Sequence, residues 1–345
     1  MTAAALDLEA IACPLCGATH ALELCLERDL ALGVPGRFAL ARCQACGLLY
    51  QNPRVRRDQL DRMYPDDYPP HARDPDIGGR LPATSPAARW LLARRLGYAH
   101  LEGGTPGLLT RLRAQARRRR VVKNVPPWQG QGRLLDVGCA TGRFLARMQA
   151  LGWRVSGIEL DPVAAAKARG VTHDVTIGDP AELALPAASF DLITAFHVVE
   201  HLPDPATARR NMLAWLAPGG LLIVEVPNVG GWGGALFGRF WSGLDFPRHL
   251  IHFTPATMRA LVERCGGRVV DEWHGSKPRW IIRSARFALA ARNTATARVA
   301  LAALDSRLGG GVVKLVLEVA LRAAGPARRG EVARYFIRHG TPCAS

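Results

Sequence analysis

From Arg133 onward the sequence alternates between short apolar segments and longer amphipathic ones, and this alternation constrains the fold more than any other feature. The apolar segments read RLLDV, RVSGI, VTIG, FDLITAF and LLIVEV. The amphipathic segments lie at residues 144–151, 162–169, 206–216 and 255–265. Two parallel strands need a crossover of a dozen or more residues, usually a helix, so this alternation indicates an α/β domain. The sequence therefore predicts a doubly wound, mostly parallel sheet.

The chain has 345 residues, 48% of them hydrophobic, which is enough for one large domain with accessory parts. We expect a compact knuckle at residues 1–52, a Pro- and Arg-rich helical linker region at 53–130, and the α/β domain at 131–345, with a basic helical insertion at 275–330. The sequence contains no uninterrupted run of about 18 or more apolar residues, so we expect no transmembrane helix. The N-terminus shows no signal-peptide pattern, so we expect a cytoplasmic protein.

Positive charge is concentrated at the two ends of the chain. Residues 1–130 hold 19 Lys and Arg against 12 Asp and Glu, and residues 275–345 hold 13 against 3. Such flanks favour an acidic partner, which is a nucleic acid, an anionic membrane surface or a phosphorylated substrate. The alternative is a solvated, Arg-rich surface. Residues 275–330 have two possible interpretations. They contact an anionic membrane at its periphery, or they pack into the core or a homodimer interface.

Four of the eight cysteines form two tight pairs, Cys13 with Cys16 and Cys43 with Cys46, separated by 26 residues. Each pair can present two thiolates to one ion, and two pairs complete the closed tetrahedral shell of a structural Zn²⁺ site. Without a secretory signal a disulfide framework explains the pairs less well. A redox role for one pair is the alternative.

A glycine-containing turn follows the first expected strand of the α/β domain, in LLDVGCATGRF. Gly138 and Gly142 let the backbone turn sharply, and the helix N-terminus beyond them can bind a carboxylate. Glu159 ends the next strand, where it can accept both hydroxyls of a ribose. Asp179 follows the third strand and can bind an adenine amino group. The other residues expected to bind the cofactor are Asp136, Cys139, Ala140, Thr141, Leu160, Pro180 and His197.

The ordered segments LDVGCATGRF, GIELDP, GDP, FDLITAFHVVEHLPDP and LAPGGLLIVEVPN resemble the class I S-adenosylmethionine-dependent methyltransferases. The resemblance implies a seven-stranded Rossmann-like sheet whose final strand is antiparallel. Residues 268–273 and 332–338 would form that final pair, with the basic helices inserted between them. It also implies S-adenosylmethionine as cofactor. Ala140 departs from the family, which usually has glycine at this position.

His197 ends the strand FDLITAF, and Glu200 and His201 share a face with it if residues 197–201 form a helical turn. Two imidazoles and a carboxylate can hold a second divalent metal, one histidine can act as a base, or the residues only hydrogen-bond neighbouring loops. The stretch resembles the ubiquinone-pathway O-methyltransferases, whose Glu-x-x-Glu-His binds a metal. Here His197 replaces the first glutamate.

The loop FWSGLDFPRHLIHFTP combines ionisable and aromatic side chains. His249 is our first choice for a general base, because histidine titrates near neutral pH, and His197 and His201 are further catalytic candidates. Arg248 is expected to bind an acidic substrate group, although an Asp245–Arg248 pair that only fixes the loop is the alternative. The residues expected to bind substrate are Trp241, Asp245, Arg248 and His252.

Two motifs are absent after the fourth expected strand of the α/β domain: the Asn/Asp-Pro-Pro-Tyr/Phe of base-amino methylases and the Pro-Cys of pyrimidine C5 methylases. A hydroxyl acceptor is therefore favoured, on a small molecule, a sugar or a lipid-linked glycan intermediate. The order of knuckle and methyltransferase resembles bacterial enzymes of polysaccharide and natural-product pathways. The alternative function is an RNA methyltransferase that uses the knuckle and the basic flanks.

Overall fold

The computed structural model describes residues 6–64, 85–101, 103–104, 106–116, 125–292, 294–306, 311, 313 and 328–340. These residues belong to two compact units, both discontinuous in sequence. Unit 1 comprises residues 1–66, 196–210 and 223–345, and unit 2 comprises residues 67–195 and 211–222. The three-part division expected from the sequence differs from this one, because the knuckle shares a unit with the C-terminal residues. Parts of the predicted linker and of the basic insertion lie outside the described residues.

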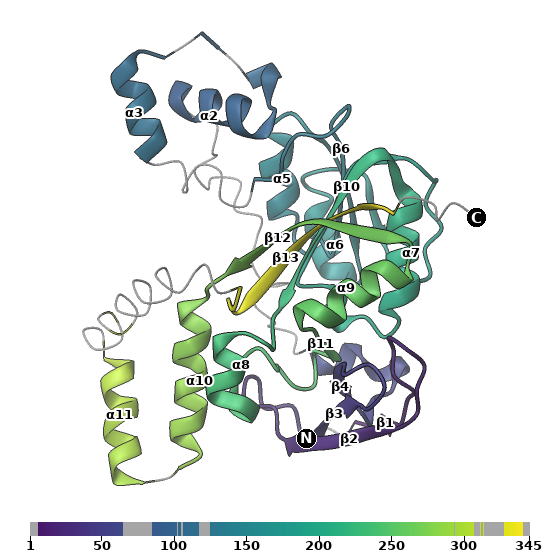
Figure 1. Cartoon of the computed structure of the whole chain (residues 1–345), viewed down its shortest axis with the longest axis vertical. Helices are drawn as coiled ribbons and strands as arrows, with labels where there is room; N and C mark the ends of the chain where they lie inside the picture. Colours follow the sequence, from purple (N-terminus) through teal and green to yellow (C-terminus); the bar gives the residue numbers. More distant parts are fainter. Residues whose placement is uncertain are drawn as a thin grey trace. The chain divides into compact units, whose positions relative to one another are not determined.

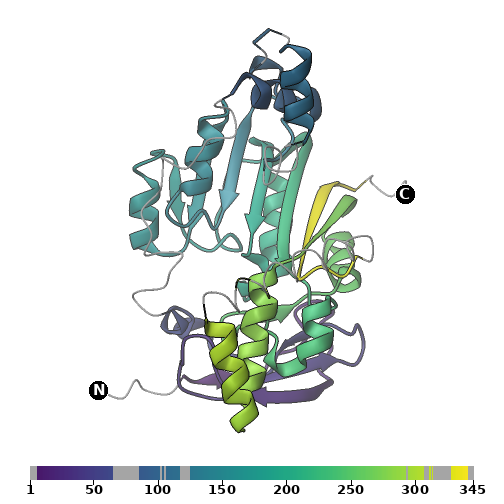
Figure 2. The ribbon, with the colours of Figure 1, turned by 90° about the vertical axis from the view of Figure 1, so that its left-hand side faces the viewer.

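Unit 2 contains the parallel strands that the sequence pattern predicts. They are β6 (Arg133–Val137), β7 (Arg154–Glu159), β8 (Val175–Ile177) and β9 (Phe190–Phe196). Strand β6 pairs in parallel with β7 and β9, and β7 pairs in parallel with β8 (Figure 2, teal strands). Leu134, Leu192 and Ile193 are fully buried, as expected for strands covered on both faces.

Short helices connect these strands. Helix α5 (Arg143–Gln149) follows β6, and α6 (Pro162–Ala168) follows β7. The side chain of Asp161 accepts the Ala164 N–H at the start of α6, and Pro162 occupies the first helical turn, so both residues favour a helix beginning there. Helices α2 (Pro86–Leu96) and α3 (Leu108–Ala116) precede the sheet, and α7 (Pro205–Trp215) precedes β10 (Leu216–Pro227).

Strands β12 (Gly267–Gly275) and β13 (Val332–His339) form the predicted antiparallel pair in unit 1. The complete sheet has seven strands in the order β12-β13-β10-β9-β6-β7-β8, which confirms the predicted fold. Helices α10 (Pro278–Ala290) and α11 (Ala295–Asp305) come between β12 and β13 in the sequence. The two helices lie side by side in the structure (Figure 1). Among the described residues, no helix is long and apolar enough to cross a membrane.

The N-terminal residues of unit 1 form a small antiparallel sheet that recruits a distant strand. Its order is β11-β4-β3-β2, with β2 at Ala21–Glu27, β3 at Phe38–Cys43, β4 at Leu49–Gln51 and β11 at Ile251–His252. Leu49 pairs with His252, and Tyr50 pairs with Ile251. Strands β1 (Leu8–Glu9) and β5 (Arg54–Val55) form a separate pair. Helices α8 (Trp232–Phe237) and α9 (Pro255–Arg264) complete the unit. The N-terminal sheet therefore holds the end of the loop that contains His249.

Candidate active site

The glycine turn of unit 2 has the geometry that its sequence predicts. Gly138 and Gly142 adopt φ values of 73° and 83°. A Cβ on Gly142 would also lie 3.0 Å from the Cα of Ala168, so glycine is required there for close packing as well as for conformation. Ala140 has a φ of 45°, a left-handed conformation that costs a non-glycine residue roughly 1–2 kcal/mol. Strain of this kind tends to persist at ligand-binding loops.

Glu159 fixes the glycine turn to the end of β7. Its Oε2 accepts the N–H of Ala140 at 2.7 Å, and its Oε1 accepts the N–H groups of Leu160 and Asp161 at 2.9 and 3.0 Å. Its carboxylate therefore already has three charge-assisted hydrogen bonds that hold it at the strand edge. The ribose contact expected of Glu159 remains a prediction.

Asp136 and Cys139 are buried beside this turn. Asp136 accepts a hydrogen bond from the Thr194 hydroxyl at 2.6 Å. Burial, together with the charge of Glu159, raises the pKa of Asp136 to about 7 despite this bond. Burial also raises the pKa of the Cys139 thiol, which is therefore neutral and unsuited to act as a nucleophile. Thr141 is buried as well.

The residues that follow β7 and β8 suit the adenosine part of the cofactor. Leu160 and Val163 are 62% and 63% exposed, which is unusual for aliphatic side chains and leaves an apolar surface beside Glu159. Asp179 accepts the N–H of Ala181 at 2.8 Å. Pro180 is buried, and its carbonyl accepts the Asn211 amide at 3.0 Å. The Glu159 carboxylate, the exposed apolar surface and the glycine turn therefore fit S-adenosylmethionine, whose individual contacts remain predictions.

Replacing Glu159 with alanine is expected to weaken S-adenosylhomocysteine binding at least tenfold. The substitution removes the charged partner expected for the ribose and the carboxylate that accepts three backbone hydrogen bonds, and a charge-assisted hydrogen bond is worth about 1.5–3 kcal/mol. Calorimetric titration measures the dissociation constant, and the exposed Glu263→Ala serves as control. Wild-type affinity in a folded Glu159→Ala variant would remove Glu159 from the cofactor site.

In unit 1, His197 lies between two carboxylates at the end of β9. Its Nδ1 is 3.2 Å from Glu200 Oε1, and its Nε2 is 3.3 Å from Glu225 Oε1. Burial opposes the charged form, but the hydrogen bonds that His197 donates to Glu200 and Glu225 outweigh it and raise the pKa of His197 to about 9. His197 is therefore an imidazolium at neutral pH that donates through both nitrogens. In this arrangement both nitrogens of His197 are bound by carboxylates, and the catalytic, cofactor-binding and metal-ligating roles expected of it remain predictions.

Glu225 itself is held in the ionised form. Although burial opposes ionisation, the hydrogen bond from His197 and the charges of Arg334 and Lys277 keep the pKa of Glu225 well below its usual range. Arg334 Nε donates to Glu225 Oε2 at 2.9 Å, and Lys277 Nζ lies 3.4 Å from Oε1. His197 has a φ of 57°, so this network holds a strained residue in place.

Glu200, His201 and His249 form a cluster in which one potential ligand atom of each lies within 4.8 Å of the others. Glu200 is fully buried, and its Oε2 has no hydrogen-bond partner among the described residues. Burial and the neighbouring His249 lower the pKa of His201 to about 4. The third residue of this cluster is therefore His249, whereas the sequence pattern predicted His197.

A hydrogen bond to a carbonyl orients the ring of His249. Its Nδ1 lies 2.8 Å from the carbonyl oxygen of Gly243, whereas His201 Nδ1 lies 3.0 Å from both the Arg248 carbonyl oxygen and the Tyr64 hydroxyl. A carbonyl only accepts, so Nδ1 of His249 carries a proton, and in the neutral ring its Nε2 keeps the lone pair. His249 Nε2 is 3.9 Å from Asp245 Oδ2, which can stabilise an imidazolium formed there.

Arg248 holds its own loop together rather than offering a free guanidinium. It is fully buried between Asp29 and Asp245. Its Nη1 and Nη2 donate to Asp29 at 2.7 and 2.9 Å, while Nε and Nη2 donate to Asp245 at 3.0 and 2.9 Å. The carbonyls of Met63 and Phe246 take further donor capacity. No N–H remains for an acidic substrate group, so the geometry favours the alternative in which the Asp245–Arg248 pair fixes the loop.

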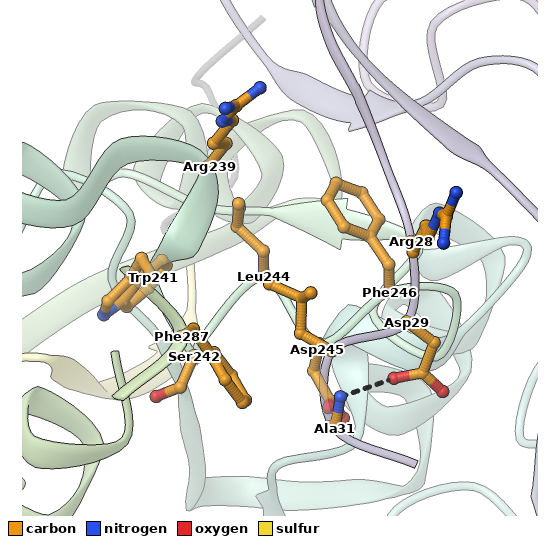
Figure 3. Close-up of a pocket in the computed structure, with 11 residues that line it drawn as sticks. Arg28, Asp29, Ala31, Arg239, Trp241, Ser242, Leu244, Asp245, Phe246 and Phe287 are labelled. Carbon is orange, nitrogen blue, oxygen red and sulfur yellow. Dashed lines mark hydrogen bonds between the residues drawn. The ribbon is translucent and has the colours of Figure 1, made fainter. Parts of the chain in front are cut away.

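The remaining loop residues are buried. Trp241 is 2% exposed, and its indole N–H has no partner among the described residues. His252 is also buried with both nitrogens unpartnered there, and burial lowers its pKa to about 3. Figure 3 shows a small pocket in unit 1 between residues 28–31, residues 239–246 and Phe287. The substrate contacts expected of Trp241, Asp245 and His252 remain predictions.

The four paired cysteines of unit 1 come together as predicted. Cys13 Sγ lies 3.5 Å from Cys46 Sγ, and Cys16 Sγ lies 3.4 Å from Cys43 Sγ. Four sulfurs around one Zn²⁺ with Zn–S bonds of about 2.3 Å lie about 3.8 Å apart, close to these separations. Gly17 and Gly47 adopt φ values of 77° and 74°, and their N–H groups bond back to the carbonyls of Cys13 and Cys43. The cluster fits a metal of tetrahedral preference.

Four residues that hold His197 and the loop of His249 in place were not predicted from the sequence, namely Asp29, Gln51, Glu225 and Arg334. Glu225 carried a readable signal, since a carboxylate inside the apolar strand LLIVEV must have a buried partner. The others carried none, because their partners lie more than 100 residues away in sequence.

Comparison with known proteins finds methyltransferases. A methyltransferase-domain family model matches residues 108–272. A probable S-adenosylmethionine-dependent methyltransferase of Mycolicibacterium smegmatis is 30% identical over 199 residues, covering 55% of this chain and 65% of that protein. A ubiquinone biosynthesis O-methyltransferase of Xanthomonas axonopodis pv. citri is 31% identical over 152 residues, covering 40% and 64%. The chain thus spans less than two thirds of the length of these curated relatives.

A solved S-adenosylmethionine-dependent methyltransferase from Mesorhizobium loti superposes with a TM-score of 0.42 and 18% identity, covering 66% of this chain and 97% of that one. The segment matched by the family model contains the glycine turn, Glu159 and Asp179. The seven-stranded sheet ends in the antiparallel pair that the motif order implied. Residues 108–272 therefore carry a methyltransferase domain, and the sheet has the fold of the class I S-adenosylmethionine-dependent methyltransferases.

Proposed function

We propose that the chain transfers a methyl group from S-adenosylmethionine to a hydroxyl oxygen of a small molecule, a sugar or a lipid-linked glycan intermediate. The observation that carries this proposal is the orientation of His249. Its Nδ1–H donates to the Gly243 carbonyl, so Nε2 is the nitrogen that keeps the lone pair when the ring is neutral, and a ring nitrogen of His249 lies within 4.8 Å of ligand atoms of Glu200 and His201. A hydroxyl acceptor must lose its proton as its oxygen attacks carbon, and a positioned imidazole can accept that proton.

In this proposal, one set of residues binds the cofactor and another accepts the proton of the acceptor. The cofactor, when bound, supplies an electrophilic methyl group on a sulfonium sulfur. Glu159, Asp179 and the glycine turn hold it, and most of the catalysis comes from positioning the two reactants. His249 would take the acceptor's proton on Nε2 while the acceptor oxygen takes the methyl group that the cofactor supplies. Asp245 and Glu200 then lie beside the resulting imidazolium.

The names of relatives support oxygen as the accepting atom. Besides the Xanthomonas protein, a malonyl-[acyl-carrier protein] O-methyltransferase of Serratia marcescens is 30% identical over 126 residues, covering 36% of this chain and 49% of that protein. A general base also serves a hydroxyl better than an amine, because a neutral hydroxyl oxygen is a weaker nucleophile than a neutral amine nitrogen and gains more from losing its proton during attack.

Mass spectrometry of reaction products tests the proposal. The full chain is incubated with cofactor carrying a deuterated methyl group and three sets of acceptors, which bear phenolic or sugar hydroxyls, amines, or activated carbons. We expect label on oxygen only. Transfer to nitrogen or carbon by the wild-type chain, with hydroxyl acceptors unlabelled, would contradict the proposal.

We further propose that the four-cysteine cluster holds one structural Zn²⁺. Protein purified without chelator is expected to contain about one zinc per chain, and Cys13→Ser or Cys46→Ser should reduce this to near zero, because a three-thiolate site binds zinc more weakly and structural zinc binding is coupled to folding. Elemental analysis measures the metal. Cys25→Ser is the matched control, since Cys25 lies in β2 outside the cluster. Zinc-free wild-type protein, or a Cys13→Ser variant with full zinc content, would refute the site.

The second divalent metal expected from the sequence would have different ligands from those predicted. With His197 occupied by two carboxylates, the residues that could hold it are Glu200, His201 and His249. Such an ion would lower the pKa of a bound hydroxyl and would occupy the lone pair that otherwise accepts the proton. A second equivalent of metal that survives Cys13→Ser and disappears in Glu200→Gln would favour this role over the base.

A further inference from the structure

We propose that Asp29 and Gln51, two residues of the cysteine-bearing N-terminal segment, are positioning residues for His249. The N-terminal sheet would then be part of the acceptor machinery and would not be an independent module for binding nucleic acid. The inference rests on the proposed role of His249, and all the contacts that carry it lie within unit 1.

Gln51 holds the backbone on both sides of Arg248. Its side chain is fully buried, and its Nε2 donates to the carbonyls of Pro247 and His249 at 2.8 and 2.7 Å. Its backbone N–H donates to the Leu250 carbonyl at 2.9 Å. Because both acceptors of the side chain are carbonyls, only the amide nitrogen can face them. One residue of β4 therefore sets the path of residues 247–250.

Asp29 holds the same segment through Arg248. Its carboxylate is fixed by the N–H groups of Ala31, Leu32 and Val34 at 2.9 to 3.1 Å, and the first of these bonds is drawn in Figure 3. It then accepts two hydrogen bonds from the guanidinium of Arg248. A bidentate pair between carboxylate and guanidinium fixes both planes relative to each other, and Arg248 adjoins His249 in the chain.

The other side of this segment contacts the turn η4 (Val199–His201), which carries the rest of the cluster. The Leu250 N–H donates to the Glu200 carbonyl at 2.8 Å, and the Arg248 carbonyl lies 3.0 Å from His201 Nδ1. Residues 248–250 are thus held between the N-terminal sheet and the turn. The separation of His249 from Glu200 and His201 therefore depends on Asp29 and Gln51.

These contacts are directional, which distinguishes them from ordinary packing. An apolar interface tolerates small shifts, whereas hydrogen bonds weaken steeply with angle and distance. A displacement of about 1 Å at a reacting group can reduce a rate by about 100-fold. The N-terminal sheet is consequently placed to set the catalytic rate, while the predicted cofactor residues 136–180 all lie in unit 2.

Two variants test the inference against two matched controls. Gln51→Met removes both amide donors at similar volume, and Asp29→Asn removes the charge that faces Arg248. Gln59→Met is the first control, because Gln59 also makes two side-chain hydrogen bonds to the N-terminal segment, at Asp7, but none to residues 241–252 among the contacts described. Asp58→Asn is the second control, because the only ion pair of Asp58 among the contacts described is with the exposed Arg56.

We expect kcat to fall about 10- to 100-fold in Gln51→Met and Asp29→Asn, with the affinity for S-adenosylhomocysteine and the zinc content unchanged. Both controls should keep wild-type kcat. If Gln51→Met does not fold, Gln51→Asn replaces it, since the shorter amide cannot reach both carbonyls. Wild-type kcat in folded, zinc-containing Gln51 and Asp29 variants would overturn the inference.

A readout independent of turnover separates this inference from the proposed function. In protein labelled with ¹⁵N-histidine, the Nδ1–H signal of His249 is assigned by its loss in His249→Asn. We expect this signal to shift in the Gln51 and Asp29 variants and to stay in place in both controls. If it shifts while His249→Asn remains fully active, the positioning stands and the catalytic role of His249 fails. If it does not shift, the positioning itself is wrong.

Discussion

Replacing Arg248 with methionine is expected to lower the free energy of unfolding by about 3–5 kcal/mol, the range found when one partner of a buried ion pair is removed. Methionine fills similar space, so the loss comes from electrostatics. Asp29 and Asp245 would remain in the interior without their shared cation. The hydrogen bonds and charges of these two carboxylates outweigh burial and hold the pKa of Arg248 above its ordinary value, which shows how strongly the folded state favours this charge.

Chemical denaturation of wild type and Arg248→Met measures this difference. Arg56→Met is the control, because Arg56 also pairs with an aspartate, Asp58, but at the surface, where exposed pairs contribute little. The triple change Arg248→Met, Asp29→Asn and Asp245→Asn should recover part of the loss, since it removes the stranded charges. An Arg248→Met variant as stable as wild type would show that the loop does not depend on the buried pair.

The parts of the fold that follow from local pattern could be predicted from the sequence. The strands from RLLDV to LLIVEV alternate with helices at intervals that a parallel sheet requires, and the structure confirms the sheet and its antiparallel end. The spacing of Cys13, Cys16, Cys43 and Cys46 likewise depends only on local geometry. The glycine turn was readable because Gly138 and Gly142 adopt conformations that few other residues tolerate.

The roles of individual charged residues could not be predicted in the same way, because they depend on partners far away in sequence. Arg248 looked available for an acidic substrate, yet Asp29, 219 residues away, accepts two of its hydrogen bonds. His197 was expected to act as a base or as a metal ligand, and the structure places Glu225 beside it. A buried charge must find a partner, but the sequence alone does not say which residue supplies it.

Replacing His249 with asparagine is expected to reduce kcat about 10²- to 10⁴-fold, the usual contribution of a general base. Asparagine is chosen because its amide nitrogen can take the place of Nδ1 and still donate to the Gly243 carbonyl, whereas nothing replaces Nε2. The change therefore removes the proton acceptor and keeps the loop contact. Affinity for S-adenosylhomocysteine should stay at the wild-type value, because the cofactor residues expected between Asp136 and Pro180 are untouched.

Initial rates with a saturating hydroxyl acceptor, compared with those of the exposed His173→Asn, measure the effect. A second variant, His249→Ala, leaves a space that added imidazole can enter. If His249 accepts the proton, imidazole should restore part of the rate of His249→Ala and leave the wild type unchanged. If His249 instead ligates a metal, the rate should fall on chelation of the wild type and return with added Mg²⁺ or Zn²⁺. Full activity of His249→Asn would exclude both roles, and the lone pair on His249 Nε2 would then have no part in methyl transfer.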